Sequence, residues 1–190
     1  FAGFSMGKRI LASFFQSVTL RTAGFNTADL GAMNDSSKAI MTLMMLIGGS
    51  PGSTAGGMKT TTIAVLILNA FATFGREAET EVFGRRFDNT VVKNAATIAI
   101  LYFFLFFTGG IAISQIEHVA LSDCLFETAS AVGTAGLTLG ITTELGLVSH
   151  LILVVLMYLG RVGGLTLIYA AISVKIQSGA KRPLDKITVG

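Results

Sequence analysis

Long apolar stretches separated by short polar or glycine-rich ones make up most of the sequence. Residues 38–74 are mostly Ile, Leu, Met, Val, Ala and Thr, but GGSPGSTAGGMK interrupts them at residues 48–59. One uninterrupted helix would extend about 55 Å, whereas the hydrocarbon core of a bilayer is only about 30 Å thick. Gly and Pro do not continue a helix cheaply, and irregular backbone inside a membrane must be buried by protein or solvated in a cavity. The pattern therefore predicts a broken membrane helix beside an aqueous path, a feature of transport.

Four further segments complete the predicted architecture. Residues 10–20 predict a helix about 16 Å long, half a membrane, that ends at the turn RTAGFN. A re-entrant segment and a surface helix followed by a loop explain this segment equally well. Residues 94–113 predict a simple membrane crossing, and residues 123–132 predict a second short helix. Residues 145–177 predict the last long helix.

The charged residues indicate the topology. The stretch 75–93 is the most charged part of the chain and holds four Lys or Arg residues, and basic residues also gather near the C-terminus. Because basic loops stay on the cytoplasmic side, we expect both segments in the cytoplasm. Residues 114–122 would then emerge on the outer side, with Glu117 and His118 as solvated loop residues.

A short internal repeat links the two halves of the chain. Thr22-Ala23-Gly24 recurs 112 residues later as Thr134-Ala135-Gly136. Each copy follows a short helix and precedes a polar connector and a long apolar run, so the context repeats as well as the triplet. The unit of short helix, glycine turn, outer connector and long helix suits backbone carbonyls directed at a permeating ion.

Arg161 lies near the middle of the last apolar run, with sixteen residues on either side. An arginine at that depth costs about 3 kcal/mol or more, so it should face the protein interior or a water-filled cavity. Neither long inner segment offers a carboxylate at matching depth. The interrupted stretch does offer carbonyls and hydroxyls, including those of Ser50, Ser53 and Thr54, so we expect Arg161 to hold that stretch.

Composition supports a membrane protein and excludes several other classes. Hydrophobic residues make up 52% of the chain and charged residues 13%, against about 25% charged in soluble domains. The net charge of +3 is spread over loops and ends, which argues against nucleic acid, and the single cysteine excludes an intrachain disulfide. GGSPG matches a nucleophile elbow without the preceding strand or a credible histidine. GSTAGGMKT misses the spacing of a phosphate-binding loop. We expect neither an enzyme nor an organic cofactor.

Four motifs in order resemble the Trk/Ktr/HKT superfamily of potassium transporters, over essentially the whole chain. FQSVTLRTAGFN is similar to the third pore loop of that family, and GGSPGSTAGGMKT to its intramembrane gating loop. LFETASAVGTAGLTLG resembles the fourth pore loop, and YLGRVGGLT the fourth inner helix with its arginine. The ending KITVG resembles the C-terminus of Ktr-type subunits.

The resemblance implies an all-α membrane protein of helix–pore loop–helix repeats, with re-entrant half-helices and one broken inner helix. Residues 1–74 would form the third repeat without its first helix, 75–93 a cytoplasmic linker, 94–177 the fourth repeat and 178–190 a cytoplasmic tail. The chain thus resembles the C-terminal half of a multi-pass cell-membrane subunit that takes up K+. The implied partners are a second copy of the subunit and a cytosolic nucleotide-binding regulatory ring.

The resemblance also assigns two groups of site residues. Backbone carbonyls of a filter would hold K+, and its residues are Thr22, Ala23, Gly24, Phe25, Gly133, Thr134, Ala135 and Gly136. The gate would consist of Gly48, Gly49, Ser50, Pro51, Gly52, Ser53, Thr54, Ala55, Gly56, Gly57, Lys59 and Arg161. Glu127 would either attract cations at the outer entrance or have a plain capping or packing role.

An alternative function is a secondary transporter with a site at the broken helix, since such helices also build midplane substrate sites. A repeat of parallel units favours a pore, whereas inverted units favour alternating access. The two units here are expected to be parallel, because both short helices would enter from the side opposite the charged loop.

Overall fold

The computed structural model describes residues 3–76, 80–82 and 84–163. It is helical apart from one small hairpin, which agrees with the all-α prediction. The elements in chain order are α1 (Met6–Thr19), α2 (Asp35–Leu46), α3 (Thr60–Phe74), β1 (Glu81–Val82), β2 (Arg85–Arg86), α4 (Asn89–Glu117), α5 (Leu121–Val132), a 3-10 turn η1 (Ile141–Glu144) and α6 (Leu147–Val162).

The predicted break in the long apolar run is confirmed. The side chain of Asn34 accepts a hydrogen bond from the Ser37 N–H at 2.9 Å and so caps the start of α2. The helix ends at Leu46, and a second helix, α3, begins only at Thr60. The intervening residues are the glycine- and proline-containing insert, whose backbone does not continue a helix cheaply.

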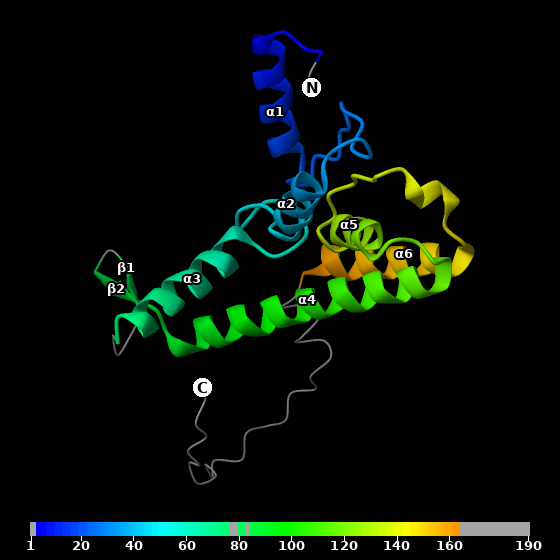
Figure 1. Ribbon diagram of the computed structural model, residues 1–190. Coiled ribbons are helices and arrows are strands. Elements are labelled where there is room, and N and C mark those ends of the chain that lie inside the picture. The colour runs from blue at the N-terminus through cyan, green and yellow to red at the C-terminus, as the bar shows by residue number, and fades with distance from the viewer. Residues whose placement is uncertain (1–2, 77–79, 83, 164–190) are drawn as a thin grey trace.

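The short helix α5 occupies the centre of the packed region, between α2, α4 and α6 (Figure 1). Between residues 124 and 132 every residue except Leu125 is buried. Glycines allow this close packing: a Cβ atom on Gly160 of α6 would lie 2.0 Å from the Val132 carbonyl oxygen. Tyr102 of α4 donates to the Gly160 carbonyl at 3.2 Å, so three helices meet at one point. Small residues at such contacts are typical of packed membrane helices.

The other short helix, α1, projects away from the remaining helices (Figure 1). Its length of 14 residues corresponds to about 21 Å, close to the predicted half-membrane helix. Several of its apolar side chains, including Met6, Leu11 and Phe14, are exposed.

The helix α4 is longer than the predicted crossing of residues 94–113. Asp88 is its N-cap, because the Asp88 side chain accepts a hydrogen bond from the Thr90 N–H at 2.9 Å. That backbone N–H holds the pKa of the Asp88 carboxyl below its usual value. Within the described residues α4 is also the one helix long and apolar enough to cross a bilayer, with 29 residues, while α3 and α6 are apolar but shorter.

The charged linker contains a hairpin that the apolar pattern does not predict. Glu81 pairs with Arg86 and Val82 with Arg85, and Gly84 at φ +72° supplies the left-handed residue between the strands. The Thr80 hydroxyl donates to the Asn69 side chain at 3.0 Å, which attaches the hairpin to α3.

The last predicted helix, residues 145–177, begins at Leu147 and is helical to Val162. Arg161 therefore lies in the last turn of α6, and residues 164–177 lie outside the described part of the chain.

Candidate functional site

The two Thr-Ala-Gly turns lie side by side. A Cβ atom built on Gly24 would lie 2.8 Å from the Ala135 carbonyl oxygen, and one built on Gly136 would lie 3.4 Å from the Gly24 Cα atom. Contact at this range leaves no room for a side chain on Gly24. The fold thus brings together two triplets that are 112 residues apart in the sequence.

Both turns have positive φ at their threonine and at their glycine. Thr22 and Thr134 have φ values of 61° and 51°, and Gly24 and Gly136 have values of 73° and 83°. The alanine between them has no positive φ in either turn. In a strand, successive carbonyl groups point to opposite sides. Residues that alternate between left-handed and right-handed backbone conformations can instead turn their carbonyl groups toward one side. A left-handed conformation costs a non-glycine residue roughly 1–2 kcal/mol, so surrounding contacts must hold the threonines.

The second turn is held by hydrogen bonds from α5. The Ser130 carbonyl accepts from the Ala135 N–H at 2.8 Å, and the Ser130 hydroxyl accepts from the Leu137 N–H at 2.9 Å. Before the turn, Gly133 lies so close to α2 that a Cβ atom would be 2.1 Å from the Met45 carbonyl oxygen. These contacts fix the backbone on both sides of Thr134.

In the first turn, the buried Thr19 at the end of α1 has the corresponding role. Its carbonyl accepts from the N–H groups of Ala23 and Gly24, both at 3.3 Å. Its hydroxyl donates to the Phe25 carbonyl at 2.8 Å, so that carbonyl is already engaged. The Phe25 side chain is 69% exposed.

Glu127 of α5 anchors the connector that follows the second turn. The side chain is only 4% exposed. One carboxylate oxygen accepts from the Thr138 hydroxyl at 2.7 Å and from the Leu139 N–H at 2.9 Å, and the other accepts from the Thr142 hydroxyl at 2.7 Å. Of the two roles left open by the sequence, this arrangement corresponds to the structural one. A carboxylate followed by two threonines at 138 and 142 is a weak sequence signal for it.

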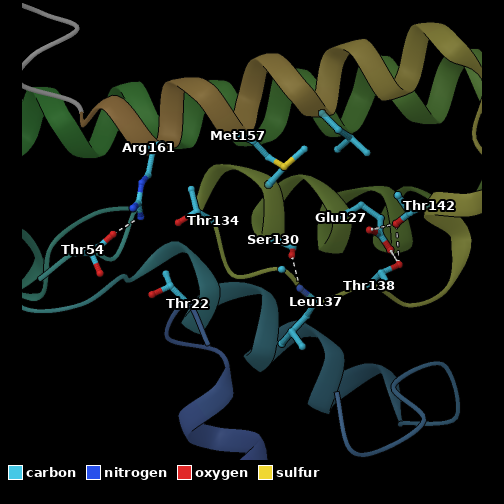
Figure 2. Close-up of a pocket in the computed structure, with 13 residues that line it drawn as sticks. Thr22, Thr54, Glu127, Ser130, Thr134, Leu137, Thr138, Thr142, Met157 and Arg161 are labelled. Carbon is cyan, nitrogen blue, oxygen red and sulfur yellow. Dashed lines mark hydrogen bonds between the residues drawn. The ribbon is translucent and has the colours of Figure 1, made fainter. Parts of the chain in front are cut away.

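The two groups of candidate residues share one cavity of about 580 Å³. Thr22, Thr134 and Gly136 of the turns line it together with Thr54 and Arg161 of the expected gate. Figure 2 shows Arg161 and Thr54 near one end of this cavity, and Glu127 with its threonines at the other.

Residues 47–59 form a loop that is closed at its base. Ile47 and Met58 form a parallel bridge, the Gly48 N–H donates to the Met58 carbonyl at 2.7 Å, and the Met58 N–H donates to the Leu46 carbonyl at 3.1 Å. A Cβ atom on Gly48 would lie 1.9 Å from the Gly56 carbonyl oxygen, so the two arms touch through glycine. The tip, residues 50–54, is exposed, whereas residues 56–58 are buried.

Cationic side chains hold three consecutive carbonyls of this loop. The Lys59 ammonium donates to the Ala55 carbonyl at 2.5 Å and to the Ser53 carbonyl at 3.3 Å. Arg161 donates through Nη1 to the Thr54 carbonyl (Figure 2). The expected contact between Arg161 and the loop is therefore present through a carbonyl. The Ser53 hydroxyl instead donates to the Ser50 carbonyl at 2.7 Å, within the loop.

The remaining residues of the expected gate occupy the tip and the base. Gly52 and Gly57 have positive φ values of 83° and 73°. Nothing lies within 4 Å of a Cβ atom on Gly52, and Pro51 beside it is exposed. A Cβ atom on Gly49 would contact Ser53 and Ala55.

The expectation that Glu117 is a solvated loop residue is wrong. Glu117 ends α4 and accepts from the Gly146 N–H at 2.8 Å and from the Ser149 hydroxyl at 2.5 Å. It therefore ties the start of α6 to the end of α4. No local pattern connects residues that far apart in the sequence, so this role was missed.

The family profile and the similar sequences of known proteins indicate the same family. Residues 1–180 match the sequence profile of the TrkH family, described as cation transport proteins. The Ktr system potassium uptake protein B of Bacillus subtilis is 35% identical over 96% of this chain, which covers 41% of that protein. The Vibrio alginolyticus protein of the same name is 40% identical over 86% of this chain and 36% of that protein. The chain thus spans about two fifths of the length of these relatives.

The fold agrees as well. The crystal structure of the potassium transporter TrkH from Vibrio parahaemolyticus superposes with a TM-score of 0.70, over 84% of this chain and 36% of that one. Sequence identity is 23%, so this likeness shows the fold. The family profile covers nearly the whole chain. The chain belongs to the Trk/Ktr superfamily of membrane cation transport proteins.

Proposed function

We propose that this chain forms part of the ion-conducting subunit of a Trk/Ktr-type potassium uptake system in the cell membrane. The observation that carries the proposal is the pair of adjacent turns, which share an alternating backbone conformation and a cavity. A filter selects ions by replacing their hydration shell with carbonyl oxygens. Carbonyls of residues 22–25 and 133–136 supply part of such a shell. The Phe25 carbonyl also accepts from the Thr19 hydroxyl and keeps its second lone pair for the ion.

The gate of this pathway is the loop of residues 48–57 together with Lys59 and Arg161. Its exposed tip is rich in glycine and serine and buries little apolar surface, which is the character of a marginally stable segment. Arg161 and Lys59 hold its carbonyls. Arg161 also places positive charge in the cavity that the turns line, which repels an entering cation. Withdrawal of the loop's exposed tip, residues 50–54, would open the path.

We infer the assembly and the membrane topology of the full-length subunit from its family as well. The full-length subunit forms homodimers in the membrane and works with a cytosolic nucleotide-binding regulatory ring. Residues 1–74 and 94–177 are two pore repeats with re-entrant half-helices. The arginine-bearing hairpin in linker 75–93 and the tail 178–190 face the cytoplasm, since basic segments are retained on that side.

Flux into proteoliposomes that hold the full-length subunit tests this function. The proposal predicts uptake of potassium in preference to sodium, driven by the potassium gradient or the membrane potential alone. Potassium uptake that strictly requires a co-transported ion would favour the secondary transporter. The absence of selective cation flux from a folded, inserted protein would contradict both.

A further inference from the structure

Thr134 contributes to two structures at once. Its backbone belongs to the second turn, with φ 51°, and its hydroxyl accepts a hydrogen bond from the Gly56 N–H of the loop at 3.1 Å. The two residues are 78 positions apart in the sequence. The loop is therefore hydrogen-bonded directly to a residue of the turn that we assign to the filter.

The fit around this hydrogen bond is tight. A Cβ atom on Gly56 would lie 2.3 Å from the Thr134 hydroxyl oxygen and 2.6 Å from its methyl carbon. The residues that follow, Gly57 and Met58, are buried, in contrast to the exposed tip. Gly57 also touches the turn, because its Cβ atom would lie 3.3 Å from the Gly133 Cα atom. The buried arm of the loop is thus packed against the turn over consecutive residues.

Thr22 is a natural control for this arrangement. It occupies the same place in the first triplet, is half-buried like Thr134, and has a similar φ of 61°. Within the described part of the chain, its hydroxyl has no hydrogen-bond partner. The two threonines therefore share a strained backbone, and only one of them holds the loop.

We propose that Thr134 is a positioning residue that couples the gate to the filter. While the loop is in place, the Gly56 N–H fixes the Thr134 side chain and supports its left-handed backbone. When the buried arm, residues 56–58, also leaves the turn, that support is lost and the second turn relaxes, so discrimination between potassium and sodium falls. Coupling of this kind is reciprocal: potassium bound in the filter must hold the loop in place by the same factor. The inference rests on the proposed function.

The test measures loop exposure and selectivity on the same variants. Met58→Cys in the buried arm serves as the reporter, in a full-length subunit whose other thiols, including the buried Cys124, are replaced. The rate of its modification by a methanethiosulfonate reagent is measured in potassium, in sodium and in choline. Relative permeability of potassium and sodium is measured in proteoliposomes.

Thr134→Val keeps the shape and removes the hydroxyl. It should raise the modification rate about fivefold, the scale of one lost hydrogen bond, and lower the preference for potassium. It should also remove the protection of the reporter thiol by potassium that the parent shows. Thr134→Ser should restore all three readouts, whereas Thr22→Val should leave the modification rate in choline, without bound potassium, unchanged. Thr134→Ala replaces the valine variant if that protein does not fold.

Faster modification with unchanged selectivity would overturn the coupling, as would equal loop exposure in Thr22→Val and Thr134→Val. Unchanged modification in Thr134→Val would show that the hydrogen bond does not hold the loop. If the proposed function itself is wrong, no variant shows selective flux, and potassium does not protect the reporter thiol of the parent from modification. Thr134→Val still exposes the loop in that case if the hydrogen bond holds it.

Discussion

Arg161, in the last turn of α6, donates a hydrogen bond to the backbone carbonyl of Thr54, 107 residues earlier in the chain. The contact joins α6 to the exposed tip of the interrupted stretch. It leaves the Thr54 side chain uninvolved, so substitution of Thr54 would not remove it. The function of the contact must therefore be tested by substitution of Arg161.

Replacement of Arg161 by Ala should increase potassium flux. The variant removes a hydrogen bond from a charged donor and a positive charge beside the turns, and we expect an increase of about tenfold, equivalent to ~1.4 kcal/mol. Arg161→Lys keeps the charge without the planar fork and should give an intermediate flux. Flux in liposomes at matched protein density measures both. A flux in Arg161→Ala equal to or below that of the parent would show that the contact does not restrict conduction.

Deletion of residues 49–56 should also raise flux, because it removes the proposed barrier. The deletion joins Gly48 to Gly57, and these two residues are already adjacent, because a Cβ atom on Gly57 would lie 3.4 Å from the Gly48 nitrogen. The deletion also removes the Gly56 partner of Thr134, so potassium preference should fall in parallel. An intact, inserted deletion protein with normal or lower flux would make the loop structural.

The two changes should not be additive. If Arg161 acts by holding the loop, its replacement has little left to remove once the loop is absent. A double-mutant cycle on flux measures this directly, with Arg161→Ala, the deletion and their combination. Strictly additive effects on the logarithm of the flux would mean that the arginine and the loop act independently.

Glu127→Gln should destabilise the connector after the second turn. The carboxylate accepts from two threonine hydroxyls and one N–H, and an amide replaces one acceptor oxygen by a donor. A buried group left without its partner costs about 1–3 kcal/mol, which should appear as a lower melting temperature of the purified subunit. Glu144→Gln in the same connector is the control, since Glu144 is exposed. Equal melting temperatures for the two variants would contradict the anchoring role.

The sequence predicts the features that depend on local chemistry. Glycines and a proline within an apolar run predict the broken helix, and the structure confirms it between Leu46 and Thr60. The repeated triplet predicts two similar turns, and φ is positive, in the left-handed region, at both Thr22 and Thr134. In both cases the residues whose chemistry causes the feature are the same residues in which the structure shows it.

Features that depend on contacts between distant segments were not predictable. The hydrogen bond between Gly56 and Thr134 joins residues with no shared periodicity. So do the hydrogen bonds by which Glu117 holds the start of α6. The role of Glu127 stayed open for the same reason, since Thr138 and Thr142 approach it only after the turn has folded back over α5. A hydroxyl or a carboxylate in the sequence does not say which segment will pack against it.

Gly136→Ser should weaken the preference for potassium over sodium. Gly136 has φ 83° and faces the Gly24 Cα atom at 3.4 Å from its Cβ position, so a side chain there strains the backbone and presses on the adjacent turn. Gly140→Ser is the matched control. Gly140 also has a positive φ, 104°, but nothing lies within 4 Å of its Cβ position.

The relative permeability of potassium and sodium in proteoliposomes, measured for the full-length parent, Gly136→Ser and Gly140→Ser, tests the central claim most directly. The adjacent turns act as a filter if the parent prefers potassium, Gly140→Ser keeps that preference and Gly136→Ser loses much of it while still folded and inserted. The same potassium preference in all three proteins would contradict the assignment of these turns to the ion path.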